Sequence, residues 1–271
     1  MAAKVDLDPF PHVVDQAHLE LYTLHVPLPA IDIGSLHFQI TKFMVMEVVA
    51  AALCLIIFIP LARHLRRRPN AHGPLANFFE GMLVFLRDDV ARSAIGHPDG
   101  DRFLPYLATA FVFILFCNLL GMIPFGASAT SSLMVTGALA LCTFLAIHGS
   151  GIKRMGPVGY FRAMVPPVPK AVWPLVFFSE LIGHVTKTLA LAIRLFANMF
   201  AGHMVLFVIL YLIVLFRTVS GSGLVGLAAA PLSVGLVVAL SLLEIFVAFL
   251  QAFIFTFLSA LFIGMAVHPH H

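Results

Sequence analysis

Charged residues are scarce in this sequence, and that scarcity excludes the usual classes of soluble protein. Only 11% of the 271 residues are Asp, Glu, Lys or Arg, whereas 61% are hydrophobic, and the mean hydropathy is +1.01. The net charge of +3 is small and dispersed, so a nucleic-acid partner is not expected. A soluble core needs far less apolar sequence than this, and the composition indicates an all-α integral membrane protein.

Paired cysteines and the common motifs for nucleotide or metal chemistry are also missing. Cys54, Cys117 and Cys142 all lie in apolar runs without C-x-x-C spacing, which is typical of small core residues. The sequence contains no P-loop and no His-Glu-x-x-His, and the G-x-G-x-x-G pattern at residues 221–226 has no strand before it. We interpret that pattern as a flexible turn, and we expect no cofactor, no metal and no catalytic site for ATP in this chain.

Apolar segments divide the sequence into about five membrane helices and one interfacial helix, within a single membrane domain over residues 1–271. A run of about nineteen apolar residues can cross roughly 30 Å of hydrocarbon at about 1.5 Å per residue. In chain order we expect an extracytoplasmic N-terminal arm at 1–40, a first span at 43–61, an amphipathic interfacial helix at 74–95, a transmembrane hairpin at 103–148 and two long helices within 172–267.

The last two apolar stretches are unusually long. Residues 175–216 and 224–267 would each extend about 60 Å as helices, which is about twice the thickness of the hydrocarbon core. Residues 236–263 contain neither proline nor glycine, so a hidden turn is not expected there. Excess length is accommodated by tilt, and we therefore expect both helices to be strongly tilted, to near-horizontal.

Basic residues predict how the chain crosses the membrane. They gather at residues 63–68, directly after the first span, and again in a loop predicted for residues 149–173, and cytoplasmic loops carry such an excess. The acidic arm at 1–40 is then outside, and an odd number of crossings leaves the C-terminus in the cytoplasm. The arm does not begin with a basic and apolar signal peptide, so we expect the first span to direct insertion.

A row of polar residues runs along the first of the two long segments. Spacings of 4, 3, 7 and 4 residues place its members on one narrow stripe of a helix. They are Glu180, His184, Lys187, Arg194 and Asn198. An arginine at the centre of a membrane helix costs at least about 2.5 to 3.5 kcal/mol, which indicates a function. Interhelical hydrogen bonds, or snorkelling of the basic side chains to an interface, are the structural alternative.

The second long segment carries an isolated carboxyl group. Glu244 and Gln251 are seven residues apart and therefore share one face of a helix. Burial and nearby charge can tune an intramembrane carboxyl group so that it exchanges protons near neutral pH. A protonated glutamate that ties two helices together is the structural alternative. Asn118, in the middle of an earlier apolar segment, is most simply an interhelical hydrogen-bonding residue.

Three runs of residues resemble one known family. The run Ile193-Arg-Leu-Phe-Ala-Asn-Met-Phe-Ala-Gly-His203 closely resembles the signature of subunit a of F-type ATP synthases, and Asn118–Pro124 and Leu250–Phe255 are similar to two further motifs of that family. The resemblance implies a stator in the bacterial plasma (inner) membrane that takes part in ATP synthesis or ATP-driven pumping. It also implies that the last two helices curve around a ring of c subunits and that the helix at 74–95 contacts the b-type peripheral stalk.

The resemblance assigns roles to single residues as well. It implies that Arg194 is the essential charge that faces a c-subunit carboxylate, between two offset aqueous half-channels. Most bacterial members have glutamate where this chain has His203 and histidine where it has Glu244, so the pair is exchanged here and we expect the two to lie close together as a proton relay. The other residues with implied roles are Glu180, His184 and Asn198 on the cytoplasmic side of the proton path, and Gln251 and Lys187 as orienting or ring-facing residues.

Two functions from other classes compete with this interpretation. A self-contained secondary transporter or cation channel would show internal repeats or broken helices at a midplane site, and the sequence shows neither. A purely structural membrane anchor would leave the charges of Arg194 and Glu244 without an explanation. The expected partners are therefore the c-subunit ring, the peripheral stalk, the rest of an ATP synthase complex and the lipid bilayer, and no nucleic acid.

Overall fold

The structure is a computed structural model that describes residues 15, 18–21, 24–33, 36–67, 73–123, 127–165, 168–169, 171–220 and 223–268. The chain forms two compact units. The first unit contains residues 1–50, 116–132 and 196–250, and the second contains residues 51–115, 133–195 and 251–271. The two longest helices contribute to both units.

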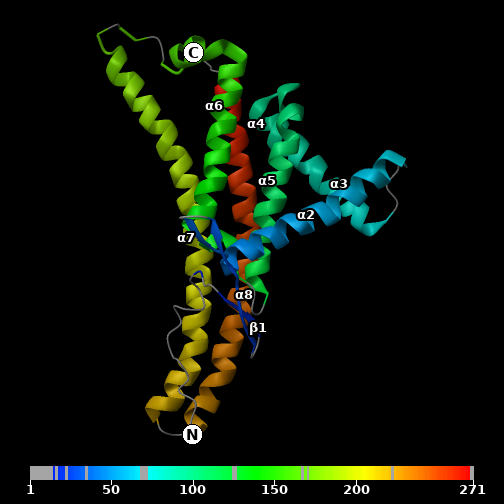
Figure 1. Ribbon diagram of the computed structural model, residues 1–271, viewed down its shortest axis with the longest axis vertical. Coiled ribbons are helices and arrows are strands. Elements are labelled where there is room, and N and C mark those ends of the chain that lie inside the picture. The colour runs from blue at the N-terminus through cyan, green and yellow to red at the C-terminus, as the bar shows by residue number, and fades with distance from the viewer. Residues whose placement is uncertain are drawn as a thin grey trace. The chain divides into compact units, whose positions relative to one another are not determined.

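Apolar helices dominate the described residues, as the composition predicts (Figure 1). Five of these helices contain stretches long and apolar enough to cross a membrane, at Lys42–Leu61, Asp99–Met122, Leu133–Ala163, Trp173–Tyr211 and Pro231–Val267. In chain order the helical elements are α2 (Lys42–Arg67), α3 (Pro74–Phe85), η1 (Leu86–Arg92), α4 (Ser93–Ile95), α5 (Asp99–Met122), η2 (Ala129–Ser131), α6 (Leu133–Ala163), α7 (Trp173–Ser220) and α8 (Gly223–Val267). The prediction of an all-α membrane protein with about five membrane helices is confirmed.

Two short β-hairpins precede the helices in the first unit, and the sequence reading did not anticipate them. β1 (His18–Leu21) pairs antiparallel with β2 (Leu24–Pro27), and β3 (Ala30–Ile33) pairs antiparallel with β4 (Leu36–Gln39). β1 (His-Leu-Glu-Leu) and β4 (Leu-His-Phe-Gln) alternate polar and apolar residues, which is the strand period, and β2 and β3 do so only in part. Strands this short carry too few alternations to stand out beside proline-rich sequence.

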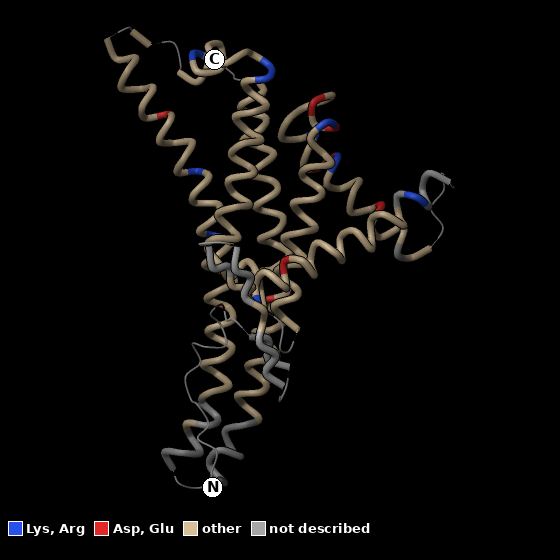
Figure 2. Tube along the Cα trace, viewed as in Figure 1, with Lys and Arg blue, Asp and Glu red and all other residues tan. Residues whose placement is uncertain are grey.

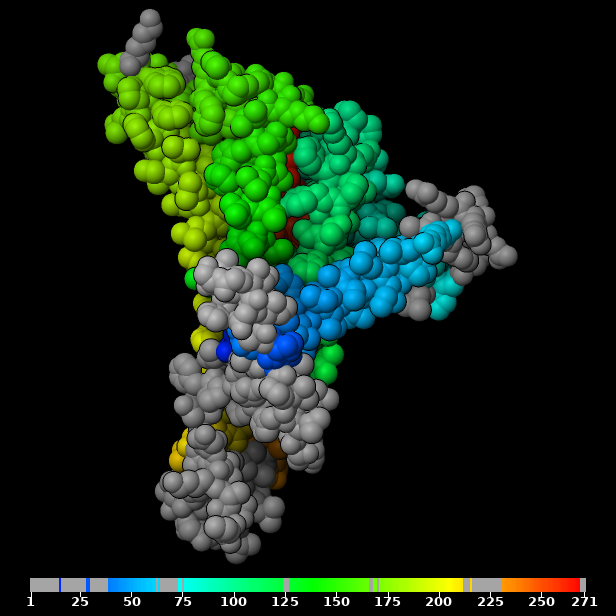
Figure 3. Space-filling model, in the orientation of Figure 1, coloured from blue at the N-terminus to red at the C-terminus, as the bar shows by residue number. Residues whose placement is uncertain are grey.

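In the second unit, α5 and α6 pack around the C-terminal part of α8. Tyr106 on α5 is joined to Thr143 on α6 by a hydrogen bond of 2.8 Å, and the Thr143 hydroxyl lies 3.5 Å from that of Ser259 on α8. In Figure 3 this part of α8, in red, is visible only between the side chains of α5 and α6. The fully buried Phe111 and Phe255 belong to this core. Apolar side chains and a few hydroxyl groups therefore hold these three helices together.

α6 is longer than the sequence reading allowed. The loop predicted for residues 149–173 is wrong at its start, because the helix continues to Ala163. Gly156 has a φ of 74°, which kinks the helix just before Pro157, and helical geometry resumes after the kink. The interruption occupies a single residue, so the backbone is helical on both sides of it.

The segment predicted as one helix over 74–95 is helical but built in three pieces. The α3 helix begins with Pro74 at its first position, where proline is well tolerated, and η1 is a π-helical stretch that carries most of the charge. α4 ends before Gly96, whose φ of 90° turns the chain toward α5. Charged residues of the second unit gather near the turn at Gly96 and along the later part of α6 (Figure 2).

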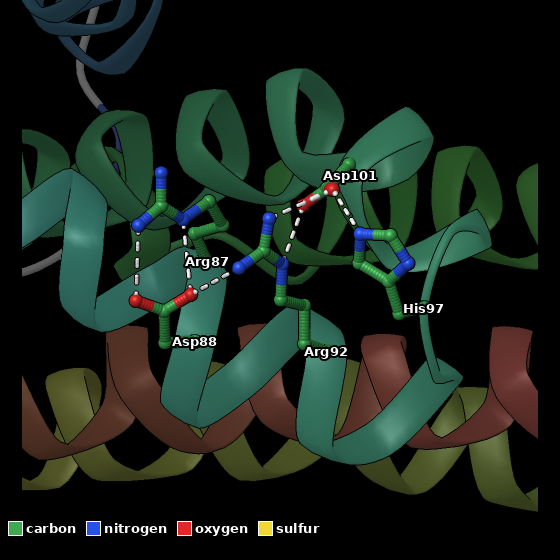
Figure 4. A network of polar contacts seen from close by, with 5 residues as sticks. All are labelled: Arg87, Asp88, Arg92, His97 and Asp101. Carbon is green, nitrogen blue, oxygen red and sulfur yellow. Dashed lines mark hydrogen bonds and ion pairs between the residues drawn. The ribbon is translucent and has the colours of Figure 1, made fainter.

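A network of ion pairs joins η1 to the start of α5 (Figure 4). Arg92 binds Asp101 through Nε at 2.8 Å and Asp88 through Nη1 at 2.9 Å, and Arg87 binds Asp88 at 2.9 Å. His97 completes the network at 3.3 Å from Asp101. The hydrogen bond from Arg87, followed by the charges of both arginines, holds the pKa of Asp88 below its ordinary value. Exposed pairs of this kind contribute little stability individually, and the network chiefly fixes the α4–α5 turn.

Candidate functional site

His203 on α7 and Glu244 on α8 form a buried ion pair in the first unit. The His203 Nδ1 atom lies 2.9 Å from Glu244 Oε1, and the two side chains are 12% and 5% exposed. Sequence spacing alone could not place these residues together, since they lie on different helices. The expectation that they lie close together, drawn from the exchanged family pattern, agrees with this geometry.

The surroundings of His203 favour a ring that is protonated on both nitrogens. Nδ1 lies 2.8 Å from the carbonyl oxygen of Met199, and Nε2 lies 3.0 Å from that of Gly121. A neutral imidazole has only one N–H, whereas an imidazolium can donate to both carbonyls at once. The cation then faces the Glu244 carboxylate. The Nδ1–H group points to the Met199 carbonyl oxygen. The contact with Glu244 is therefore mainly electrostatic and is not a linear hydrogen bond.

The Glu244 carboxyl group has few other polar neighbours. Neither of its buried oxygens accepts a hydrogen bond from any described residue. A buried carboxylate without hydrogen-bond donors depends on its counterion, so loss of the charge on His203 would leave Glu244 buried and uncompensated. The arrangement therefore makes each member of the pair dependent on the other.

Two glycines make the room that this pair occupies. A Cβ atom on Gly202 would lie 2.7 Å from Glu244 Oε1, and one on Gly121 would lie 2.8 Å from His203 Nε2 and 2.5 Å from the Ser128 Cβ. Real Cβ atoms essentially never approach this closely, so any side chain at either position would have to displace the pair. Gly202 and Gly121 were present in the sequence motifs, but nothing in their spacing revealed this role.

Asn118 anchors α5 beside this site. Its side-chain amide donates to the Ala248 carbonyl on α8 at 3.1 Å, and its oxygen accepts from the Thr130 hydroxyl at 2.5 Å. Because Thr130 uses its proton in that bond, Ser128 donates to Thr130 at 2.7 Å. The interpretation of Asn118 as an interhelical hydrogen-bonding residue is confirmed.

Arg194 lies on α7 in the second unit and is exposed. Across the part of the chain that the structure describes, its side chain has no hydrogen bond, ion pair or ring contact. Its neighbours on the same helix face, Ala190 and Ala197, are small and also exposed. A guanidinium flanked by alanines leaves space for another helix to approach closely.

The remaining predicted residues differ in exposure. Glu180 and His184 are half-buried, whereas Lys187 and Asn198 are exposed, and the Lys187 ammonium lies 5.9 Å above the Phe262 ring. Gln251 is 5% exposed on α8, and no hydrogen bond between it and Arg194 is found among the described residues. The predicted stripe on α7 is therefore half-covered at its start and open from Lys187 onward.

Two residues that no sequence motif singles out adjoin this stripe. His148 and Tyr160, both on α6, form a hydrogen bond, and the His148 ring lies 5.4 Å from the His184 ring. His148 closes an apolar run and Tyr160 follows the kink, so neither carried a signal of its own. Among the described residues no group of three or more histidine, cysteine or acidic side chains is arranged to hold a metal ion.

The flexible turn expected at 221–226 is helical from Gly223 onward. Gly223 and Gly226 lie in the first turns of α8, while residues 221 and 222 lie outside the described residues. Thr188 donates its hydroxyl hydrogen to the His184 carbonyl at 3.0 Å, and the backbone of α7 is helical on both sides of it.

Comparison with known proteins identifies the family. A family model described as ATP synthase A chain matches residues 44–264. ATP synthase subunit a of Chloroherpeton thalassium is 41% identical over 269 residues, covering 98% of this chain and 78% of the relative. The Myxococcus xanthus subunit a is 43% identical over 244 residues, covering 90% and 78%, and subunit a 2 of Chlorobaculum tepidum is 38% identical over 258 residues, covering 94% and 71%. This multi-pass membrane protein belongs to the ATP synthase subunit a family.

Proposed function

We propose that this chain is the proton-translocating stator subunit of an F-type ATP synthase. In this role it couples proton flow across the membrane to rotation of a c-subunit ring, and so to ATP synthesis or ATP-driven pumping. The observation that carries the proposal is Arg194, an exposed guanidinium on an apolar helix without a counterion among the described residues.

Electrostatics explains why Arg194 needs a partner from another chain. Placing an arginine at the centre of a membrane helix costs at least about 2.5 to 3.5 kcal/mol. A guanidinium stays charged at any accessible pH, so it cannot escape this cost by losing a proton. An ionised carboxylate on a passing c subunit would offset it. The same fixed charge would stop protons from crossing directly between two offset half-channels.

The His203–Glu244 pair is the proton-accepting site of the outer half-channel. A proton that arrives at the pair protonates one member and is passed on to a c-subunit carboxylate, which then becomes neutral and can rotate into lipid. The 2.9 Å contact supports this role because it places an imidazole and a carboxyl group within proton-transfer distance of each other. After nearly a full turn the c subunit releases its proton on the cytoplasmic side, where Glu180, His184 and Asn198 line the second half-channel.

The remaining polar residues act on the ring-facing side. Lys187 adds a positive charge to that of Arg194 on α7. Gln251 orients the Arg194 guanidinium by hydrogen bonding when the ring is present. The membrane potential supplies about 2.3 kcal/mol per charge per 100 mV to each transfer. The direction of rotation therefore follows the field and the proton concentrations together.

The proposal also fixes the surroundings of the chain. The N-terminus is outside and the C-terminus is cytoplasmic in a bacterial plasma membrane, because basic residues gather after the first span and along the later part of α6. The segment at 74–95 contacts the b-type peripheral stalk. The last two helices follow the curved surface of the c-ring.

Reconstitution tests the proposal against a self-contained transporter. The chain is placed in liposomes alone, or together with its c-ring and peripheral stalk, and proton flow is driven by a potassium diffusion potential. Protons should flow only in the second preparation, and substitution of Arg194 by alanine should uncouple that flow from rotation. Equal proton flow through the chain alone would overturn the stator role.

A further inference from the structure

The kink in α6 brings together two side chains that a straight helix would keep apart. His148 and Tyr160 are twelve residues apart in the sequence, which corresponds to about 18 Å along an unbroken helix. The break at Gly156 folds the later turns back, so that the Tyr160 hydroxyl lies 2.8 Å from His148 Nδ1. Tyr160 is 3% exposed, and the hydrogen bond is thus enclosed by protein.

A second imidazole lies beside this bond. The His184 ring on α7 is centred 5.4 Å from the His148 ring, at an interplanar angle of 55°. At this separation a proton can pass between the rings directly or through one bridging water. Glu180 and Lys187 on α7 are the charged groups whose fields act on His184. His148, Tyr160 and His184 form what is called here the imidazole cluster.

Neighbouring residues pack against the imidazole cluster but leave one of its nitrogen atoms without a hydrogen-bond partner. The Phe144 ring packs 4.1 Å from His148, and Gly151 leaves the space that the Tyr160 ring fills. The buried His148 Nε2 atom has no hydrogen-bond partner among the described residues. A histidine that served packing alone would normally have both nitrogens satisfied, since a buried polar atom without a hydrogen-bond partner destabilises the fold.

The position of the cluster matches one end of a proton path. Arg194 lies ten residues beyond His184, about 15 Å along α7. On the other side of the cluster, Trp173 stacks on Phe177 at 5.3 Å, and tryptophan is enriched where helices leave the membrane. The cluster therefore lies between the Arg194 level and the water-facing end of α7.

We propose that the imidazole cluster relays protons from the level of Arg194 to the cytoplasmic surface. This inference rests on the proposed function and adds His148 and Tyr160, two residues of α6, to the exit path. It also gives His184 a specific chemical partner in place of a general role as a lining residue.

The relay moves one proton at a time and leaves no net charge. A proton from His184 or a bridging water binds His148 Nε2, which forms an imidazolium. The Nδ1–H bond then breaks as its proton moves to the Tyr160 oxygen, and the original Tyr160 hydroxyl proton leaves for water. At His148 and Tyr160 one N–H and one O–H bond form while one of each breaks, and the donor, either His184 or the bridging water, loses the proton that enters, so one proton enters this pair of residues and one leaves.

Substitutions in the assembled ATP synthase test the relay. Tyr160→Phe removes only the hydroxyl group, and His148→Gln removes the titrating ring while keeping a polar side chain. ATP-driven proton pumping is measured in inverted membrane vesicles as a function of pH. Each variant should pump several-fold more slowly, and the pH dependence of the rate roughly between pH 5 and 8, where imidazole titrates, should flatten in His148→Gln.

A matched control separates relay from packing. Phe161→Leu alters a neighbouring, 40% exposed side chain of the same helical turn and should pump at the wild-type rate with an unchanged pH profile. Immunoblotting for the assembled complex normalises all rates. Wild-type pumping and an unchanged pH profile in both Tyr160→Phe and His148→Gln would overturn the relay, as would losses that match the loss of assembled complex.

The same vesicles distinguish this inference from the stator role. If substitution of Arg194 leaves pumping intact, the stator proposal fails whatever the cluster does. If substitution of Arg194 abolishes pumping while the cluster variants behave as wild type, the stator role stands and protons leave by another route.

Discussion

The two basic residues of α7 that matter most lie in opposite electrostatic environments. His203 is buried, with a carboxylate at 2.9 Å and two carbonyl oxygens as hydrogen-bond acceptors. Arg194 is exposed and has no such partner among the described residues. A cation with its counterion in the same chain can titrate as part of a pair. A cation without one must find its counterion in another molecule.

The ion-pair network of η1 and α5 provides a third case. Arg92 binds two carboxylates of its own chain, yet it lies at the surface, where such pairs are weak. An arginine can therefore be structural and easily replaced, or, as we propose for Arg194, unpaired and essential. The comparison predicts that proton pumping is lowered most by substitution of a cation that lacks a counterion in its own chain. The number of contacts that a cation makes should matter less.

The largest expected effect belongs to Arg194→Lys in the assembled complex. The substitution keeps the positive charge but removes the planar fork that binds a carboxylate through two hydrogen bonds. ATP-driven proton pumping should fall to background while the complex still assembles. Ile193→Val, at the neighbouring exposed position, and Arg92→Lys should both pump nearly as well as wild type. Retained pumping in Arg194→Lys would break the comparison.

The next effect concerns the buried pair. Glu244→Gln leaves His203 without its counterion, and breaking a buried pair costs about 3 to 5 kcal/mol when the remaining charge stays ionised. Proton pumping should drop about ten-fold, because the neutral amide cannot exchange protons. The exchanged double variant His203→Glu, Glu244→His should recover a substantial part of the rate, since it restores one imidazole and one carboxylate. No recovery would show that the geometry, and not the pair of groups, is what matters.

A smaller effect is expected when the pair is displaced but not removed. Gly202→Ala would place a Cβ atom 2.7 Å from Glu244 Oε1, so the carboxylate must shift. Pumping should fall by a factor of about two to five, in line with a modestly misplaced proton-transfer group. Gly81→Ala, at a helix position with nothing within 4 Å of the added atom, is the matched control and should leave pumping unchanged. Equal rates in the two variants would show that the pair tolerates movement.

The smallest effect concerns pH and the surface network. The folded-state pKa of Asp88 lies below its ordinary value because of Arg87, so the ion pair stabilises the protein above the unfolded-state pKa. That stability is lost as the pH falls through the folded-state pKa. The thermal midpoint of the purified complex should therefore decline slightly on acidification, and Asp88→Asn should remove part of this decline. A decline of the same size in the variant would assign the pH dependence to other groups.

The sequence predicted the membrane helices because a long apolar run has few alternative folds. It predicted that Glu244 and Gln251 share a face, and both are buried on α8. Helical spacing also placed the polar residues of α7 on one stripe. These features depend on one helix at a time, and the period of the helix is enough to derive them.

Features that depend on two helices were harder to foresee. The clearance at Gly202 and the contact between His148 and Tyr160 exist only once separate segments have packed, and the sequence does not give that packing. The kink at Gly156 could not be derived from the sequence, because glycine and proline are equally typical of a loop and of a bent helix. The closeness of His203 and Glu244 was anticipated through the family resemblance and not through spacing.

The space at Gly202 also constrains how this protein can change over generations. Only a hydrogen atom of Gly202 fits between the α7 backbone and the Glu244 carboxylate, so a larger residue at position 202 requires the acid to move. A substitution of this glycine is therefore tolerated only as far as the Glu244 side chain can shift. The two positions thus constrain each other in evolution, although they belong to different helices.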